Sequence, residues 1–209
     1  MKNSIFEFPM SEKLKDLVYG SYLSVVNQLH GPDSSTRNTT YTSELFEMLN
    51  INWNRWLRVS VTGSKGKGST TVMLASILSA GGEHVGIVTS PHLRKFNERI
   101  RIDGNCVTDD ELARAIVAIA PVVNTLRFKI PSPHYLGPGG VILALAAKIF
   151  EARNISVVIA EAGRGGEYDE VSLIKGNVSV ITPIMLKHAD KIGPGLRDIA
   201  RTKTYITAP

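Results

Sequence analysis

Apolar residues recur along the chain at two different spacings, and these spacings predict its helices and strands. Between residues 11 and 30 they recur close to once per helical turn, which predicts an amphipathic opening helix. A second short helix is expected over residues 43–50. From residue 55 onward, β-branched residues approach a glycine-rich turn, which predicts a strand followed by a helix over residues 68–80.

Strands and helices continue to alternate after that point. Thr108 stands three residues before Glu111, the arrangement of a capping box, and Leu112, Ile116 and Ile119 follow on one helical face. The other expected elements are strands at 84–90, 155–163 and 177–184, a hairpin at 98–107, and helices at 141–154 and 195–203. Near-continuous apolar strands separated by helices are typical of a parallel sheet covered on both faces. The fold class is therefore α/β, with a mostly parallel sheet flanked by helices.

Length and composition fit a single globular domain. The 209 residues, of which 43% are hydrophobic and 21% charged, suffice to bury one core. No run of about 18 apolar residues and no signal-peptide pattern occurs, so no membrane association and a cytoplasmic location are expected. Cys106 is the only cysteine, which excludes an internal disulfide and a cysteine-based zinc site.

The chain carries a formal net charge of +5, with a pI near 9.3. This charge favours anionic partners such as nucleotides and polycarboxylates. The basic residues are scattered, without a run of five and without interleaved aromatic residues. Nucleic acid is therefore not expected as a partner.

The stretch VTGSKGKGST, residues 61–70, has the form of a phosphate-binding loop. Gly63, Gly66 and Gly68 allow backbone N–H groups to crowd around an anion at the start of a helix, and Lys67 supplies a mobile charge. The spacing departs from the Walker pattern, and a plain glycine turn between a strand and a helix is the alternative.

Two hydroxyl residues follow the glycines of this loop. Ser69 and Thr70 could cap the helix, coordinate magnesium or bind phosphate. The cap needs no ligand, so the residues alone leave these roles open.

This loop and a second one carry a family resemblance. The loop at 63–69 resembles the "GTNGKGS" loop of the folylpolyglutamate synthase and dihydrofolate synthase family, within the Mur ligase superfamily of ATP-dependent amide-forming enzymes. That family has a second loop similar to "TSPHL" followed by "FNERI", and this chain reads TSPHL at 89–93 and FNERI at 96–100. His92 in that loop could help to bind substrate or could order the loop.

The resemblance extends to the end of the chain. "VVIAEAGRGGEYD" resembles the family's "EVGLGGRLDATN" and places Glu161 at a strand end, where a metal-binding carboxylate is expected. "VSVITPIMLKHADKIGPGLRDIARTK" is similar to "VSVITSIGLDHTEYLGDTLEEIAREK", so His188 matches the metal-site histidine and Lys203 the terminal lysine, commonly carbamylated in the family. Without the resemblance, His188 would be a structural histidine and Lys203 a helix-terminal lysine.

The resemblance implies a P-loop-type Mur ligase central domain over residues 1–209, with the C-terminal ligase domain absent. The implied cofactors are ATP and Mg²⁺, and the implied catalytic residues are Lys67, His188 and Lys203. The metal ligands would be Ser90, Glu161 and His188. The implied nucleotide contacts are Gly63, Ser64, Lys65, Gly66, Lys67, Gly68, Ser69 and Thr70.

The implied reaction is ATP-dependent amide formation through an acyl phosphate. A folate-like or other carboxylate would be joined to an amino acid such as glutamate, and a partner chain would supply the C-terminal domain. The alternative is a nucleotide-binding subunit without independent turnover. The chain departs from the family pattern in several places. Lys65 replaces an asparagine, Glu167 an arginine and Lys187 an aspartate, and "EYDEVS" stands in place of "LDATN". Pro-Gly-Gly at 138–140 also replaces the family's polar and aromatic residues at a helix entrance, which leaves folate uncertain as the substrate.

Overall fold

The computed structural model describes residues 7–28, 38–163, 166–186 and 194–207; within the first helix, it describes the side chains of residues 12–21 and 23. The helices are α1 (Glu7–Gln28), α2 (Thr40–Met48), α3 (Lys67–Ala80), α4 (Asp109–Lys129), α5 (Pro138–Ala152) and α7 (Leu196–Thr204). The strands are β1 (Leu57–Thr62), β2 (Val85–Val88), β3 (Ile100–Ile102), β4 (Asn105–Cys106), β5 (Val157–Glu161) and β6 (Val178–Ile181). Short 3₁₀ turns include η3 (Phe96–Arg99) and η4 (Glu170–Ile174).

The strands form one sheet in the order β4-β3-β2-β5-β1-β6. β2, β5, β1 and β6 run parallel, whereas β3 and β4 form the expected antiparallel hairpin beside β2. In the register of β1 and β5, Val61 lies opposite Glu161, and Val61 also lies opposite Val180 of β6. The carboxyl ends of the four parallel strands therefore meet at one edge.

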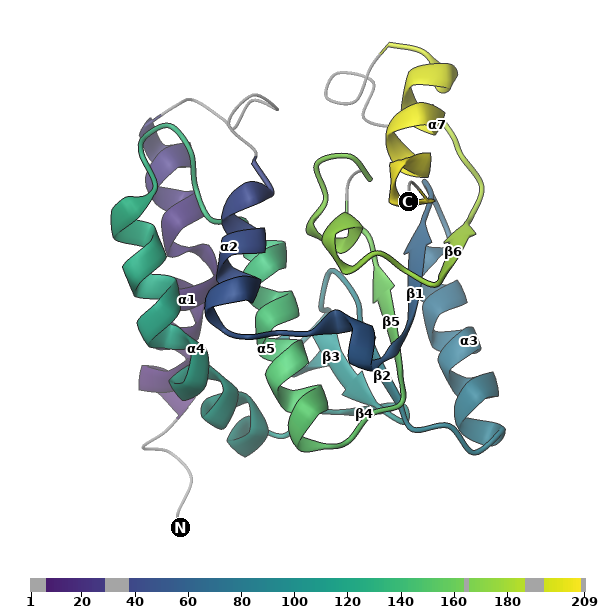
Figure 1. Cartoon of the computed structure of the whole chain (residues 1–209), viewed down its shortest axis with the longest axis horizontal. Helices are drawn as coiled ribbons and strands as arrows, with labels where there is room; N and C mark the ends of the chain where they lie inside the picture. The colour runs from purple at the N-terminus through teal and green to yellow at the C-terminus, as the bar shows by residue number, and fades with distance from the viewer. Residues whose placement is uncertain (1–6, 29–37, 164–165, 187–193, 208–209) are drawn as a thin grey trace.

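Helices cover the two faces of the sheet unequally. Figure 1 shows α1, α2, α4 and α5 gathered on one side of the sheet and α3 on the other. The larger apolar core lies under the first group, and α5 is buried almost all round because it lies between the sheet and the outer helices. The smaller core joins Ala75 of α3 to Val59, Val61, Val85 and Ile159 of the sheet.

The expected elements form, with two local differences. The Thr108 capping box is confirmed, since Thr108 Oγ1 accepts the Glu111 N–H at 3.2 Å and Glu111 Oε2 accepts the Thr108 N–H at 2.8 Å. Leu23 is one of the apolar residues that recur between positions 11 and 30, and it is 48% exposed, so it does not lie in the buried stripe of α1. Burial on both faces is wrong for β6, whose Val178 and Ile181 are exposed, because β6 is at the edge of the sheet and β1 is its only neighbouring strand among the described residues.

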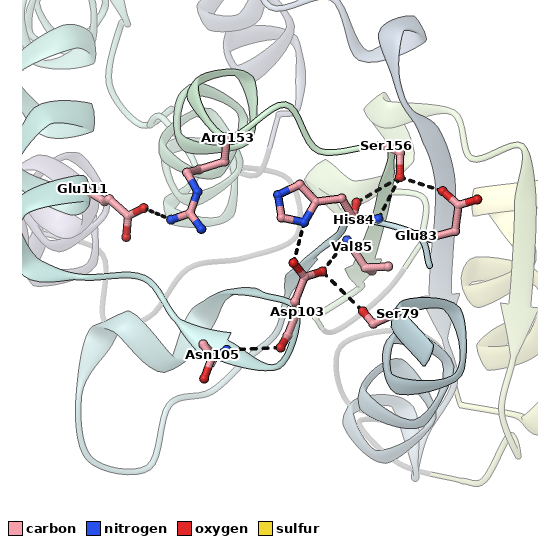
Figure 2. Close-up of polar contacts among 9 residues, drawn as sticks. All are labelled: Ser79, Glu83, His84, Val85, Asp103, Asn105, Glu111, Arg153 and Ser156. Carbon is pink, nitrogen blue, oxygen red and sulfur yellow. Dashed lines mark hydrogen bonds and ion pairs between the residues drawn. The ribbon is translucent and has the colours of Figure 1, made fainter. Parts of the chain in front are cut away.

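A polar cluster holds the amino ends of β2 and β5, at the edge opposite the strand carboxyl ends. Figure 2 shows His84 Nδ1 facing the Asp103 carboxylate, which also accepts the Ser79 hydroxyl at 3.3 Å. Ser156 Oγ donates to Glu83 at 2.7 Å and accepts the His84 N–H at 3.1 Å. These contacts hold the amino ends of the two strands in place. The edge available for a binding site is the opposite one, where the strand carboxyl ends meet.

Within the described ranges, no helix is both long enough and apolar enough to cross a membrane.

Candidate active site

The loop between β1 and α3 lies at the carboxyl edge of the sheet, and its path requires glycine at two positions. Gly63 has φ +135° and Gly66 has φ +80°, backbone conformations that other residues rarely adopt. A Cβ at Gly63 would also collide with Thr182 Oγ1, whereas a Cβ at Gly66 would meet nothing within 4 Å. The loop is therefore packed tightly against Thr182 at Gly63, whereas the space beside Gly66 is open.

The segment after β6 holds this loop in place. The Ser64 N–H donates to the Pro183 carbonyl at 3.0 Å, and Ser64 Oγ accepts the Met185 N–H at 3.0 Å. The backbone N–H and the hydroxyl of Ser64 thus both engage the protein itself. The first amides of α3 have no partner within the helix, and this is the usual basis of anion binding at a helix N-terminus.

The structure excludes one of the alternatives for Ser69 and Thr70. The N-cap of α3 is Gly66, in a left-handed conformation and without a side-chain hydrogen bond, and the helix begins at Lys67. Ser69 and Thr70 therefore lie inside the first turn and do not cap it. Of the roles left open for these two residues, capping is excluded because a left-handed glycine starts the helix before the hydroxyl residues.

Lys67, Ser90 and Glu161 come together from three strand ends. Lys67 Nζ lies 4.0 Å from Glu161 Oε1, and the Ser90 N–H donates to Glu161 Oε2 at 3.1 Å. The Lys67 side chain is 16% exposed and that of Glu161 is 6% exposed, so both charges are largely removed from water. A Cβ at Gly68 would lie 3.4 Å from Glu161 Oε2, so glycine gives the carboxylate room beside α3.

The Glu161 carboxylate is suited to holding a cation. Burial raises the pKa of Glu161 above its ordinary value of 4.5, and the Ser90 N–H and the Lys67 charge oppose that rise. A cation would stabilise the charged form that burial disfavours. One carboxylate and a hydroxyl are hard oxygen donors of the kind Mg²⁺ uses together with phosphate oxygens and water, so these residues fit magnesium.

The third predicted metal ligand, His188, lies outside the described residues, as does Lys187. Among the residues that the structure does describe, no group of three or more His, Cys, Asp or Glu side chains could hold a metal ion. Glu161 and Ser90 are therefore the described part of the predicted metal site. Lys65, in the loop before α3, is exposed.

Lys203 of α7 is buried, being 3% exposed, and it is electrostatically coupled to this site. Burial lowers the pKa of Lys203 below its ordinary value of 10.5, the positive charge of Lys67 lowers it further, and Asp169 opposes both. A neutral amine is thus more accessible at Lys203 than at an ordinary lysine.

Asp169 is not among the site residues predicted from the sequence. Its carboxylate accepts the N–H groups of Gly163 at 2.8 Å and Val171 at 3.1 Å, and it is 3% exposed. The sequence did contain an indication that Asp169 belongs to the site, because this residue stands where the family's "LDATN" has its aspartate. The Glu167 N–H donates to the Thr202 carbonyl at 3.1 Å, which joins this loop to α7.

The loop after Ser90 is ordered by its own polar residues. Glu98 accepts the N–H groups of Leu93 at 2.7 Å, Arg94 at 3.0 Å and Lys95 at 3.0 Å. These hydrogen bonds, led by that from Leu93, lower the pKa of Glu98 below its ordinary 4.5.

His92 belongs to the same ordered loop. Its Nδ1 accepts Arg99 Nε at 2.8 Å, and its ring lies 6.0 Å from that of Phe96. Of the two roles considered for His92, the structure supports loop ordering.

The relatives found by comparison with known proteins agree with one another in kind. No protein-family model matches the chain. A probable bifunctional folylpolyglutamate synthase/dihydropteroate synthase of Halobacterium salinarum is 34% identical over 148 residues, which are 71% of this chain and 18% of that protein. The dihydrofolate synthase/folylpolyglutamate synthase of Escherichia coli is 35% identical over 147 residues, 70% of this chain and 33% of that protein.

Solved structures agree with these relatives. The Mycobacterium tuberculosis folylpolyglutamate synthase complexed with ADP and AMPPCP has a TM-score of 0.76 and 28% identity, over 90% of this chain and 41% of that one. This chain therefore shares its fold with part of a solved folylpolyglutamate synthase. The chain belongs to the folylpolyglutamate synthase and dihydrofolate synthase family, and it spans less than half the length of each of these relatives.

Proposed function

We propose that this chain binds ATP and magnesium at the carboxyl edge of its sheet and acts in an ATP-dependent amide ligase of the folylpolyglutamate synthase type. The observation that carries the proposal is that Lys67, Glu161 and the Ser90 amide lie in contact, largely shielded from water, at the N-terminus of α3. Family membership supports it, as does the relative solved with ADP and AMPPCP. A cytoplasmic location is part of the same proposal.

In this proposal the nucleotide phosphates bind the main-chain amides between Gly63 and Thr70. Gly66 leaves open space at the start of α3, where the helix end favours an anion. Lys67 neutralises phosphate oxygens, and burial strengthens that interaction because little water screens it. Ser64 shapes the loop through its contacts with the segment after β6.

Magnesium would be held by Glu161 and Ser90, with His188 as the third ligand. When bound, it would neutralise phosphate charge. Glu161 is kept in place by the Ser90 N–H, and Gly68 leaves it the room to face the loop. The Lys67 and Glu161 side chains lie in the same buried space, so the contact of Lys67 with phosphate depends on the charge of Glu161.

The proposed reaction has two steps. A substrate carboxylate oxygen attacks the γ-phosphorus of ATP, and the bond to the β-phosphate oxygen breaks, which gives an acyl phosphate and ADP. An amine then attacks the acyl carbon, loses a proton and displaces inorganic phosphate, which leaves the amide. Lys67 and the α3 amides position the phosphates and stabilise the charge that develops on them.

Lys203 is proposed to act as a carbamate. Its amine, made more often neutral by burial and by Lys67, would attack carbon dioxide and lose one proton as the N–C bond forms. The product would replace a buried cation with an anionic oxygen group. Asp169 opposes this change because its negative charge favours the ammonium form.

The substrates are proposed from the relatives. The acid would be a folate or a related carboxylate, and the amine an amino acid such as glutamate. The relatives contain more than twice the matched length, so polypeptide beyond these residues, from the same or a partner chain, is proposed to complete the site.

Trapping the acyl phosphate tests the ligase function directly. The chain is incubated with ATP, magnesium, a folate and hydroxylamine, and both hydroxamate and phosphate are measured. Hydroxamate formation that Lys67→Ala abolishes, and that Lys129→Ala at an exposed position of α4 retains, would support phosphoryl transfer to a carboxylate. ATP hydrolysis that is unchanged in Lys67→Ala would contradict it.

A second candidate is a nucleotide-binding subunit without turnover of its own. The small share of the relatives' length that the chain spans favours it. Magnesium-dependent ATP binding without hydroxamate would support this candidate. Efficient amide formation by the chain alone would exclude it.

A further inference from the structure

The loop at 63–70 starts beside the end of β6. β1 and β6 are parallel, and Thr62, the last residue of β1, lies opposite Ile181, the last residue of β6. The residue that follows β6 is Thr182, which is buried. Its side chain lies against the first glycine of the loop, since a Cβ at Gly63 would collide with it. Thr182 therefore joins the end of β6 to the start of the loop.

Thr182 donates two hydrogen bonds to the main-chain carbonyl of Thr62. Its N–H donates to that oxygen at 2.8 Å, and its hydroxyl donates to the same oxygen at 3.0 Å. A carbonyl oxygen has two lone pairs, so these two donors complete its hydrogen bonding. The hydroxyl bond is buried, so water does not readily replace the hydroxyl if it is removed.

The held carbonyl also fixes the direction of the first loop amide. The peptide bond between Thr62 and Gly63 is trans, so its C=O and N–H point in opposite directions. Holding the carbonyl against Thr182 therefore directs the Gly63 N–H away from Thr182. Gly63 is the first of the residues whose amides are proposed to bind phosphate.

Thr182 differs from the residues that follow it because it acts on the loop through its side chain. Ser64 is held by the Pro183 carbonyl and the Met185 N–H, which are both main-chain groups. The second bond to the Thr62 carbonyl comes from a hydroxyl group. A substitution at residue 182 can therefore remove one hydrogen bond at the start of the loop and leave the main-chain contacts of Ser64 in place.

We propose that Thr182 is a positioning residue for the nucleotide phosphates. Its side chain holds the peptide unit between Thr62 and Gly63, so that the first amide of the loop is already directed when the nucleotide arrives. Thr182 acts through the main chain of Gly63, and it makes no contact with phosphate itself. This inference rests on the proposed function, because it takes nucleotide phosphate as the ligand of the loop.

Two substitutions separate positioning from stability. Thr182→Val keeps the branched shape and removes the hydroxyl, so the affinity for ATP with magnesium should fall about 3–10-fold. Thr182→Ser keeps the hydroxyl and removes a buried methyl group, so its Tm should fall by about 2–4 °C while its affinity stays within about twofold of that of the unaltered chain. Calorimetric titration and thermal melting measure the two effects.

Thr125→Val on the exposed surface of α4 is the matched control, since the Thr125 hydroxyl also donates to a main-chain carbonyl, that of Pro121, at 2.9 Å. Its affinity should equal that of the unaltered chain. Affinities that follow Tm through the set, or an equal affinity in Thr182→Val and Thr182→Ser, would overturn the proposal.

A second pair keeps the test decisive if Thr182→Val does not fold. Thr182→Ala and Thr182→Ser both remove the buried methyl group, and they differ from each other by the hydroxyl alone. Thr182→Ala should therefore bind ATP about 3–10-fold more weakly than Thr182→Ser. Equal affinity in these two variants would overturn the proposal.

Amide exchange in the absence of nucleotide separates failure of this inference from failure of the proposed function. The Ser64 amide, followed by NMR, should exchange about 3–10-fold faster in Thr182→Ala than in Thr182→Ser. A chain that shows this difference but binds no ATP would contradict the proposed function and would support the hold of Thr182 on the loop. ATP binding that Lys67→Ala weakens, but that is equal in Thr182→Ala and Thr182→Ser, would contradict the role of Thr182 alone.

Discussion

Lys67 Nζ lies 4.0 Å from Glu161 Oε1, which joins the first turn of α3 to the end of β5. The two residues are 94 positions apart in sequence, and they meet because β1 and β5 are adjacent parallel strands whose carboxyl ends share one edge. The contact is long for an ion pair and nearly closed to water. It leaves Lys67 able to turn toward an added anion and Glu161 toward an added cation.

Glu161→Gln is expected to separate stability from function. Because the pKa of Glu161 is raised in the folded state, folding binds a proton more tightly, and stability falls as pH rises from about 4.5 through the folded-state pKa. At pH 7, without ligands, Glu161→Gln should therefore melt at the same temperature as the unaltered chain or higher.

The same variant should weaken magnesium binding in the presence of ATP by about 10–100-fold. Calorimetric titration and thermal melting measure the two effects, with Glu47→Gln on the exposed surface of α2 as the control. Glu161→Gln that retains full magnesium affinity would remove Glu161 from the metal site.

Lys203 should titrate below its ordinary pKa of 10.5, and two neighbours should move its titration in opposite directions. Lys67→Met removes a positive charge and should raise the pKa of Lys203, whereas Asp169→Asn removes a negative charge and should lower it. Since the folded state releases this proton more easily, stability should rise as pH increases through the folded-state pKa toward 10.5.

NMR of ¹³C-methylated lysines measures this titration, and Lys129→Ala should leave the Lys203 midpoint in place. A Lys203 midpoint that does not respond to Lys67→Met would show that the two residues are not coupled.

Glu98 should hold the loop at 93–95 through the three amides it accepts. Glu98→Gln weakens those hydrogen bonds by removing the charge, and amide exchange there should become roughly tenfold faster. The pKa of Glu98 is lowered in the folded state, so its contribution to stability is present above pH 4.5 and is lost as pH falls through the folded-state value. Hydrogen exchange followed by mass spectrometry checks this, and exchange unchanged from that of Glu47→Gln would contradict it.

The sequence predicted those features that depend on short-range pattern. The period of apolar residues indicated the helices and the parallel strands, and the spacing of Thr108 and Glu111 marked the start of α4. The rule that ligands gather at strand carboxyl ends predicted that Lys67, Ser90 and Glu161 share one edge.

Features that depend on contacts between distant segments could not be read from spacing. The hydrogen bond from the Thr182 hydroxyl to the Thr62 carbonyl joins residues 120 positions apart. The hydrogen bond from the Met185 N–H to Ser64 Oγ depends on the position of β6 beside β1. The sequence placed the start of α3 at about residue 68, one residue from the observed Lys67, but it could not show that the N-cap is a left-handed Gly66.

The central claim is that the loop at 63–70 holds nucleotide phosphates, and ATP binding by the Lys67→Ala variant tests it most directly. Affinity for ATP with magnesium is measured by calorimetry on the unaltered chain, on Lys67→Ala and on Lys129→Ala, which removes the same charge far from the site. An affinity at least about tenfold weaker is expected for Lys67→Ala alone. Equal affinity in all three proteins would contradict it.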